Sequence, residues 1–246
     1  MKKSLFILFV LLYSQYMSAQ KFEDLDLYRL DFSAGINTSY IQNKSMESYF
    51  DTYNKNNFAN PDDGFTNLRM LSGYELGVKW NYLSLHYGQH TKSQWRDISN
   101  GVQRQFRLIN NYVNVLASFE IGKSKTKISF GMNAYYSKFI AQVIYPNGEI
   151  SRGLDYNLNG TYKGWALNGA LRIEKGLGSN DKKFFSLYCQ FTGPVAGTAS
   201  DYNDFNSGKG ALNTGNNAIT RLDFKSEFRG LIFGLNYNFR NKTDKK

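Results

Sequence analysis

The sequence predicts an all-β protein: an eight-stranded antiparallel up-and-down transmembrane β-barrel with four longer outer loops and short periplasmic turns. Three observations predict it. The chain opens with an export signal, eight later stretches alternate apolar and polar residues, and the connections between them alternate in length. The 246 residues suit a single domain.

The N-terminal segment has the three-part layout of a secretory signal peptide. Lys2 and Lys3 give a basic start, residues 5–12 are apolar, and Ala19 ends a short run of small residues. The apolar run is shorter than the roughly 20 residues that cross a bilayer as a helix. We therefore expect a signal peptide over 1–19 and a short periplasmic segment over 20–27. The barrel is expected over 28–239, followed by a basic periplasmic tail over 240–246.

The strands show a period of two residues. In the first, Leu30, Phe32 and Ile36 alternate with Asp31 and small residues. The last alternates in the same way and ends on an aromatic residue. The eight predicted strands lie within 30–40, 68–80, 83–90, 109–120, 128–136, 165–173, 185–191 and 230–239.

The connections should lie alternately at the two ends of the barrel. Longer ones are expected at about 43–66, 96–104, 145–160 and 193–218. Short ones are expected near Asn81, at 122–126 and at 175–182. The two longest show no apolar period of their own, so they are predicted to be loops.

Alternation alone also fits a soluble barrel, so the nature of the polar face decides the class. That face consists mainly of Gly, Ser and Asn, unlike the mixed charged surface of a solvated sheet, and most strands are long enough to cross a tilted bilayer path. Large aromatic residues near strand ends indicate an interfacial girdle. The predicted girdle comprises Trp80, Trp95, Trp165, Tyr237 and Phe239.

The signal peptide, the eight amphipathic strands and the closing strand 230–239 resemble the small bacterial outer-membrane β-barrel families, which include OmpA/OmpX-type transmembrane barrels and PorT-like barrels. The resemblance covers nearly the whole mature chain and is architectural. Such barrels usually finish on the terminal aromatic residue, whereas 240–246 follow Phe239 here. The resemblance implies that the protein lies in the outer membrane of a Gram-negative cell. It also implies roles as diverse as adhesion, structural anchoring and support of a secretion system.

Charged residues on the inward face are expected to pair, because an eight-stranded barrel is just wide enough to be filled by side chains and buried charges need partners. We therefore predict a charge network that plugs the lumen. Its predicted members are Arg69, Glu75, Lys79, Glu120, Arg172, Glu174, Glu227 and Arg229.

The full chain has a net charge of +10; without Lys2 and Lys3 of the predicted signal peptide the mature chain has +8, and this charge is concentrated at one end of the predicted barrel. The short turns carry a basic periplasmic rim, which could meet anionic headgroups or a periplasmic protein, or could simply be solvated. No basic and aromatic platform for nucleic acid accompanies it. The rim comprises Lys123, Lys125, Lys127, Lys182 and Lys183.

Catalytic and metal chemistry have weak support in the sequence. His86 and His90 lie on one strand about 13 Å apart at 3.3 Å per residue, too far to share an ion. Ser84, His86 and Glu75 share the inward face, which lipid cannot reach. Cys189 is expected to be a small lipid-facing residue. No catalytic, metal or cofactor site is predicted.

The sequence therefore favours a non-enzymatic integral outer-membrane barrel that contacts membrane lipid. It would present surface loops or act as an accessory subunit of an envelope or secretion complex, with a protein partner. An outer-membrane lipid-modifying enzyme and a narrow solute channel are the alternatives.

Overall fold

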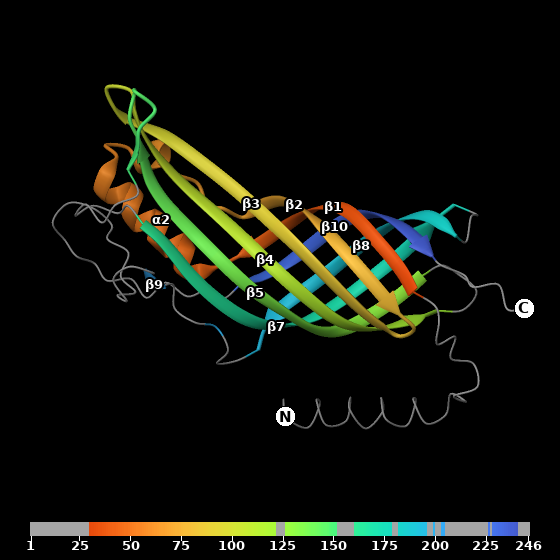
Figure 1. The fold of residues 1–246 in the computed structure, drawn as a ribbon. Coiled ribbons are helices and arrows are strands. Elements are labelled where there is room, and N and C mark those ends of the chain that lie inside the picture. The colour runs from red at the N-terminus through yellow and green to blue at the C-terminus, as the bar shows by residue number, and fades with distance from the viewer. Residues whose placement is uncertain are drawn as a thin grey trace, which may run out of the picture.

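The computed structural model describes residues 30–121, 126–151, 160–178, 182–195, 199, 203–204, 226 and 228–240. Eight long antiparallel strands close into one barrel (Figure 1), which confirms the predicted fold class. The proposed signal peptide 1–19, the segment 20–27 and positions 241–246 of the tail lie outside the described residues. The long strands are β1 (Leu30–Gln42), β2 (Met70–Trp80), β3 (Leu83–Ser99), β4 (Val102–Glu120), β5 (Thr126–Ile144), β7 (Gly160–Leu177), β8 (Lys183–Pro194) and β10 (Arg229–Arg240).

Neighbouring strands pair in sequence order, and β1 pairs with β10 to close the barrel. Two short strands pair with long ones at the outer end: β6 (Ile150–Ser151) pairs with β5, and β9 (Asn203–Asp204) pairs with β7. The stagger of the barrel follows from the pairing of the strands. Starting at Leu30 of β1 and moving from each residue to its direct partner on the next strand, one circuit of the barrel ends on β1 at Tyr40, ten residues further on. With ordinary strand spacings this stagger tilts the strands by about 41° from the barrel axis.

The alternation sorts the side chains into a polar inside and an apolar outside. Inward residues such as Asn110, Asn133 and Asn168 are fully buried, whereas Ile36 on the outside is 69% exposed. The first ten residues of β1 rise about 25 Å at this tilt, which matches the apolar band of an outer-membrane barrel. The outside is therefore a lipid-facing surface of the right height.

Four strands extend beyond the others at the outer end. The predicted loop 96–104 is wrong: β3 continues to Ser99 and β4 starts at Val102. Asn100 and Gly101 form the turn, both with positive φ (48° and 77°), as the common two-residue hairpin turn requires. β5 and β7 also continue past the ends of their neighbours, so β3, β4, β5 and β7 form a projecting sheet (Figure 1).

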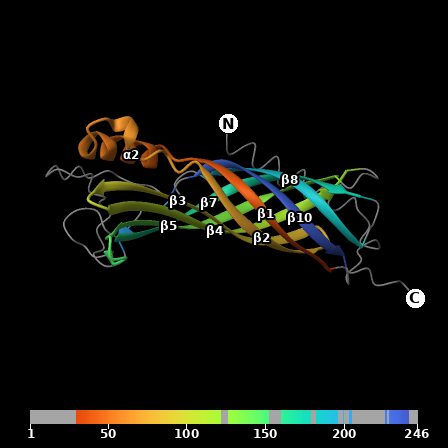
Figure 2. The same cartoon turned by 90° about the horizontal axis from the view of Figure 1, so that it is seen from above.

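The predicted loop 43–66 is also wrong in part, because it contains the helix α2 (Lys44–Asn57) and a short 3-10 turn, η2 (Pro61–Asp63). The Asn43 side chain caps the helix by accepting from the Met46 amide at 3.0 Å. Figure 2 shows α2 lying along the projecting strands. No helix in the described part of the chain is long and apolar enough to cross a membrane.

Candidate functional site

A charged cluster lies in the barrel lumen, centred on Glu75 of β2. Glu75 is 1% exposed, and its Oε1 accepts from Arg172 Nη1 at 2.7 Å and from Asn236 Nδ2 at 3.3 Å. Its Oε2 accepts from the Tyr112 hydroxyl at 3.0 Å. His86 Nδ1 lies 3.4 Å from Oε1. Donors from three other strands, with the His86 imidazole of a fourth nearby, thus surround one carboxylate, which offsets the cost of burying its charge.

Arg172 of β7 is the cationic partner and is also almost completely buried. Its guanidinium carbon lies 3.6 Å from the centroid of the Tyr188 ring, and its Nη2 lies 3.4 Å from Glu174 Oε2. Glu174 accepts from Ser186 Oγ at 2.6 Å. The planar guanidinium can stack on the ring and pair with carboxylates at its edge, which a lysine could not do.

Two tyrosine rings fill the lumen beside this cluster. Asn37 Nδ2 donates to the hydroxyls of both Tyr112 and Tyr188, at 3.0 and 2.9 Å. A Cβ at Gly88 would come within 2.3 Å of the Tyr112 ring, and one at Gly234 would come within 2.3 Å of the Tyr188 ring. The two glycines therefore give the rings the space that lets them fill the lumen.

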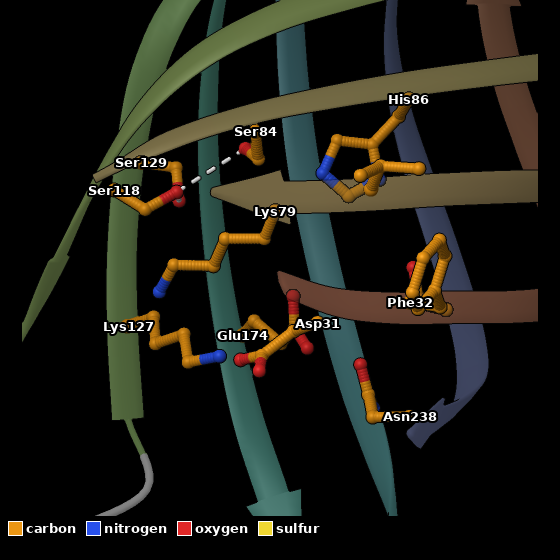
Figure 3. Close-up of a pocket in the computed structure, with 12 residues that line it drawn as sticks. Asp31, Phe32, Lys79, Ser84, His86, Ser118, Lys127, Ser129, Glu174 and Asn238 are labelled. Atoms are coloured by element: carbon orange, nitrogen blue, oxygen red, sulfur yellow. Dashed lines mark hydrogen bonds between the residues drawn. The ribbon is translucent and has the colours of Figure 1, made fainter. Parts of the chain in front are cut away.

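At the inner end, the lumen contains a small cavity of about 30 Å³, room for a water molecule or two. Figure 3 shows Lys127 extending toward the carboxylates of Glu174 and Asp31, with Lys79 beside it. Arg240 Nε pairs with Asp31 Oδ2 at 3.2 Å near the mouth. Charged side chains thus gather at the inner mouth as well as at the centre of the barrel.

The structure brings together only part of the predicted lumen network. Glu75, Arg172 and Glu174 lie together, and Lys79 lines the inner cavity. Arg69 does not, since it precedes β2 and pairs with Glu47 of α2 at 3.0 Å.

Glu120 joins the network at the inner rim, whereas the inward placement of Arg229 is wrong. Glu120 has the inward parity of Ser118 and lies 3.8 Å from both Lys79 and Arg240, with a 45% exposed side chain because β4 ends there. Arg229 is exposed because it shares the outward parity of Leu231. Glu227 lies outside the described residues. The predicted network did not include Tyr112, Tyr188 or the asparagines of the lumen, because it was chosen from charged residues and these residues are neutral.

The predicted girdle residues are all exposed on the outside of the barrel. Trp80, Tyr237 and Phe239 lie at its inner end, where β1 pairs with β2 and β10. Trp165 lies on β7 near the outer edge of the apolar surface. Trp95 lies on the projecting part of β3, beyond the last β2–β3 pair, and so above the barrel proper.

The predicted basic rim divides in the structure. Lys182 and Lys183 are exposed at the inner end. Lys127 is buried and faces the lumen mouth, so its rim placement is wrong: it has the inward parity of Ser129. Lys123 and Lys125 lie outside the described residues.

At the outer end, α2 packs onto the inward face of the projecting sheet. Its Met46, Tyr49, Phe50 and Tyr53 are buried at the spacing of one helical face. Phe106 of β4 is the centre of this cluster; its ring contacts all three aromatic rings of that face, and those of Phe65 and Phe139.

Polar contacts fix the segment that follows the helix. Asn54 accepts from the Phe65 amide at 2.9 Å and donates to the Phe65 carbonyl at 2.8 Å. Gln94 of β3 accepts from the Thr66 amide, and Arg96 donates to the Gly64 carbonyl. The helix, η2 and the projecting strands therefore form one folded unit, which we call the outer platform (residues 43–69, 92–108, 138–144 and 160–164).

Burial shifts the acidity of two platform tyrosines. The pKa of Tyr49 is raised well above its ordinary value because the ring is buried, although the Arg104 guanidinium opposes the shift. Burial also raises the pKa of Tyr53, against the same cation. Both phenols therefore stay neutral at physiological pH.

An open groove of about 620 Å³ lies on the exposed side of the platform. Carboxylates, amides and cations line it together, so it suits a polar ligand rather than an acyl chain. Its lining includes Asp51, Lys55, Asp62, Thr66, Asn67 and Arg69.

The candidates for metal and catalytic chemistry are arranged as follows. In the described part of the chain, no group of three or more His, Cys, Asp and Glu residues could hold a metal ion. The His90 ring lies against the Tyr112 ring, tilted by 33° with the centroids 4.8 Å apart. Ser84 Oγ contacts the Leu116 carbonyl and Ser118, while His86 contacts Glu75.

These features define a class. A closed antiparallel barrel with an apolar exterior about 25 Å high, a polar interior and aromatic residues at its edges is a transmembrane β-barrel of the bacterial outer membrane. The platform lies at the end with the longer connections, which is the outer side.

Comparisons with known proteins identify no family for this chain. No family model matches the chain, and no curated protein matches it. One similar solved structure is Ail, the attachment invasion locus protein of Yersinia pestis, in complex with the heparin analogue sucrose octasulfate. It has 9% identity and a TM-score of 0.43 over 87% of this chain and 98% of that one. Another is Neisserial surface protein A, with 8% identity and a TM-score of 0.40 over 85% and 96%. The class assignment depends on the barrel's own surfaces.

Proposed function

We propose that the protein is a non-enzymatic outer-membrane barrel that binds an extracellular ligand through its outer platform. One observation carries the proposal: buried polar side chains fill the barrel interior, whereas the outer strand ends hold an ordered helix beside an open polar groove. A filled barrel serves as a rigid membrane support, and ligand-binding residues are commonly placed on segments that such a support positions.

The lining of the groove indicates the kind of ligand. Asp51 and Asp62 supply carboxylates, Lys55 and Arg69 supply cations, and Asn67 supplies an amide. Such a mixture recognises a ligand with both donors and acceptors, such as an extended polypeptide or a glycan. The enzyme and channel alternatives have less support, because the Ser84 hydroxyl bonds the Leu116 carbonyl and Ser118, His86 lies against Glu75, and side chains fill the lumen.

Site-specific photocrosslinking in intact cells tests the proposal. A photoreactive residue is placed at Asp51 in the groove, at Leu187 on the lipid-facing surface, or at Lys182 at the inner end. The proposal expects an adduct with an extracellular molecule from position 51 and none from position 187. An envelope-protein adduct from position 182 alone would instead favour the accessory-subunit role, and no adduct from position 51 would refute ligand binding in the groove.

A further inference from the structure

The projecting sheet has an outward face that continues the lipid-facing surface of the barrel. Residues of one strand alternate between two faces, so odd-numbered residues of β3 remain on the outside beyond Thr91, the last residue of β3 that pairs with β2. In the described part of the chain, α2 packs on the opposite, inward face. A lipid that packs against the barrel below therefore holds its headgroup beside this outward face.

Trp95 is a large aromatic residue on this face, and it is 56% exposed. It lies four residues beyond Thr91 along β3. A rise of about 2.5 Å per residue on strands with this tilt places Trp95 about 10 Å above the last β2–β3 pair. This level is beyond the apolar band, so acyl chains do not cover the ring. Tryptophan is the residue type most typical of the anchors that hold a binding partner.

Carboxamide side chains lie beside the Trp95 ring. Gln105 is directly opposite Trp95 on β4, and Gln103 is two residues further out, opposite Asp97. Gln105 Oε1 accepts from Gln142 Nε2, and Gln103 Nε2 donates to Asp97 Oδ1 at 3.1 Å, so both amides are held in place. Among the described residues, three polar atoms around the ring have no hydrogen-bond partner: Gln105 Nε2, Gln103 Oε1 and the Trp95 indole N–H. The face therefore offers an aromatic surface with donors and an acceptor at its edge.

We infer that Trp95, Gln103 and Gln105 bind a sugar ring in the headgroup of an outer-leaflet glycolipid. A sugar ring has C–H faces that pack on an indole, and hydroxyls that donate to and accept from carboxamides. The three side chains are neutral, which favours a sugar over a phosphate group. Because the face continues the lipid-facing surface, a lipid anchored beside the barrel presents its headgroup there at a high effective concentration. The site lies on the face opposite α2, so it is separate from the groove on the platform.

The test uses the purified full-length barrel in nanodiscs of a neutral phospholipid, with bound glycolipid counted by native mass spectrometry. Its probes are lipopolysaccharide that carries a core oligosaccharide, lipid A without these sugars, and the free core oligosaccharide. Lipopolysaccharide should bind more tightly than lipid A, and the free oligosaccharide should bind weakly because it lacks the membrane anchor. Trp95→Ala should weaken lipopolysaccharide binding about tenfold, as expected for the loss of one aromatic anchor, and should leave lipid A binding unchanged. Trp95→Tyr should retain most of the affinity.

A matched control is available at the inner end of the barrel. Trp80 also lies on the outside and is 50% exposed, close to the exposure of Trp95. It pairs with Leu30 at the end of the barrel opposite the projecting sheet. Trp80→Ala should therefore leave lipopolysaccharide binding unchanged. A heat-modifiable shift in gel mobility verifies that every variant is folded.

Three results with the purified barrel would overturn the inference. They are equal binding of lipopolysaccharide and lipid A, unchanged binding by Trp95→Ala, and an equal loss in Trp80→Ala. Tight binding of the free oligosaccharide would assign the site to a soluble glycan and so also reject a glycolipid. In intact cells, a photoreactive residue at Gln105 should label a glycolipid, and a protein adduct in its place would reject the inference as well. None of these outcomes depends on whether the groove binds an extracellular ligand.

Discussion

The substitution Phe106→Ala should release helix α2 from the platform and leave the barrel closed. Phe106 is fully buried and its ring contacts five other aromatic rings, three of them on α2. Truncation of a buried phenylalanine costs about 3–5 kcal/mol. A 14-residue helix is marginal without tertiary contacts, so the loss should appear as undocking and unwinding of α2.

Amide hydrogen exchange measures this directly. If the whole cost falls on docking, protection of the α2 amides should drop by about a hundred- to a few thousandfold, while the amides of β1 and β2 keep their protection. The control is Phe233→Ala, which truncates a ring of the same size that is 52% exposed on the lipid-facing surface. Unchanged exchange in α2, or equal loss of protection throughout the barrel, would refute the view that Phe106 holds a separable platform.

Three other predictions concern the lumen and the platform. Glu75→Ala leaves the buried Arg172 without its closest carboxylate and should destabilise the barrel by about 3–5 kcal/mol; an unchanged temperature for the loss of heat-modifiable mobility would contradict this. The purified protein should show no single-channel conductance in planar bilayers, because side chains fill the lumen; regular open steps would show otherwise. Burial raises the pKa of Tyr49 above the value of about 10 for the undocked chain, so the docked platform should be stable below pH 10 and weaken as the pH rises beyond it. The difference in absorbance at 295 nm between the wild type and Tyr49→Phe should therefore titrate well above pH 10, and a midpoint near 10 would count against the burial.

The sequence predicted the barrel because alternation is a property of single strands. Each strand has one lipid-facing and one lumen-facing side, so a period of two marks it without knowledge of its neighbours. The same parity places Glu75, Arg172 and Glu174 inside. It also places Glu120 on the inward side, but it could not show that this side chain is 45% exposed at the rim, because strand parity does not show where the lumen ends.

The platform escaped prediction for two local reasons. Met46, Tyr49, Phe50 and Tyr53 follow a helical period, but polar residues surround them in a stretch that is rich in Asn and Ser. The dipeptide Asn100-Gly101 is a strong hairpin signal, yet the composition of residues 96–104, with Asn, Gly, Asp and Ser, predicted a longer loop. Both signals were present, and both were outweighed by composition.

The outer platform is an extension of the barrel and not a flexible appendage. β4 carries Arg104 and Phe106 beneath α2, and the same strand continues without a break through Asn110, Tyr112 and Asn114 in the lumen. Tyr112 donates to Glu75, so residues of one strand contribute to both the platform and the charge cluster. Because β4 is paired on both sides along nearly its whole length, the surface beneath α2 has the order of a sheet. A helix docked on such a surface holds the groove in a fixed shape, which lowers the entropy cost of binding a ligand there.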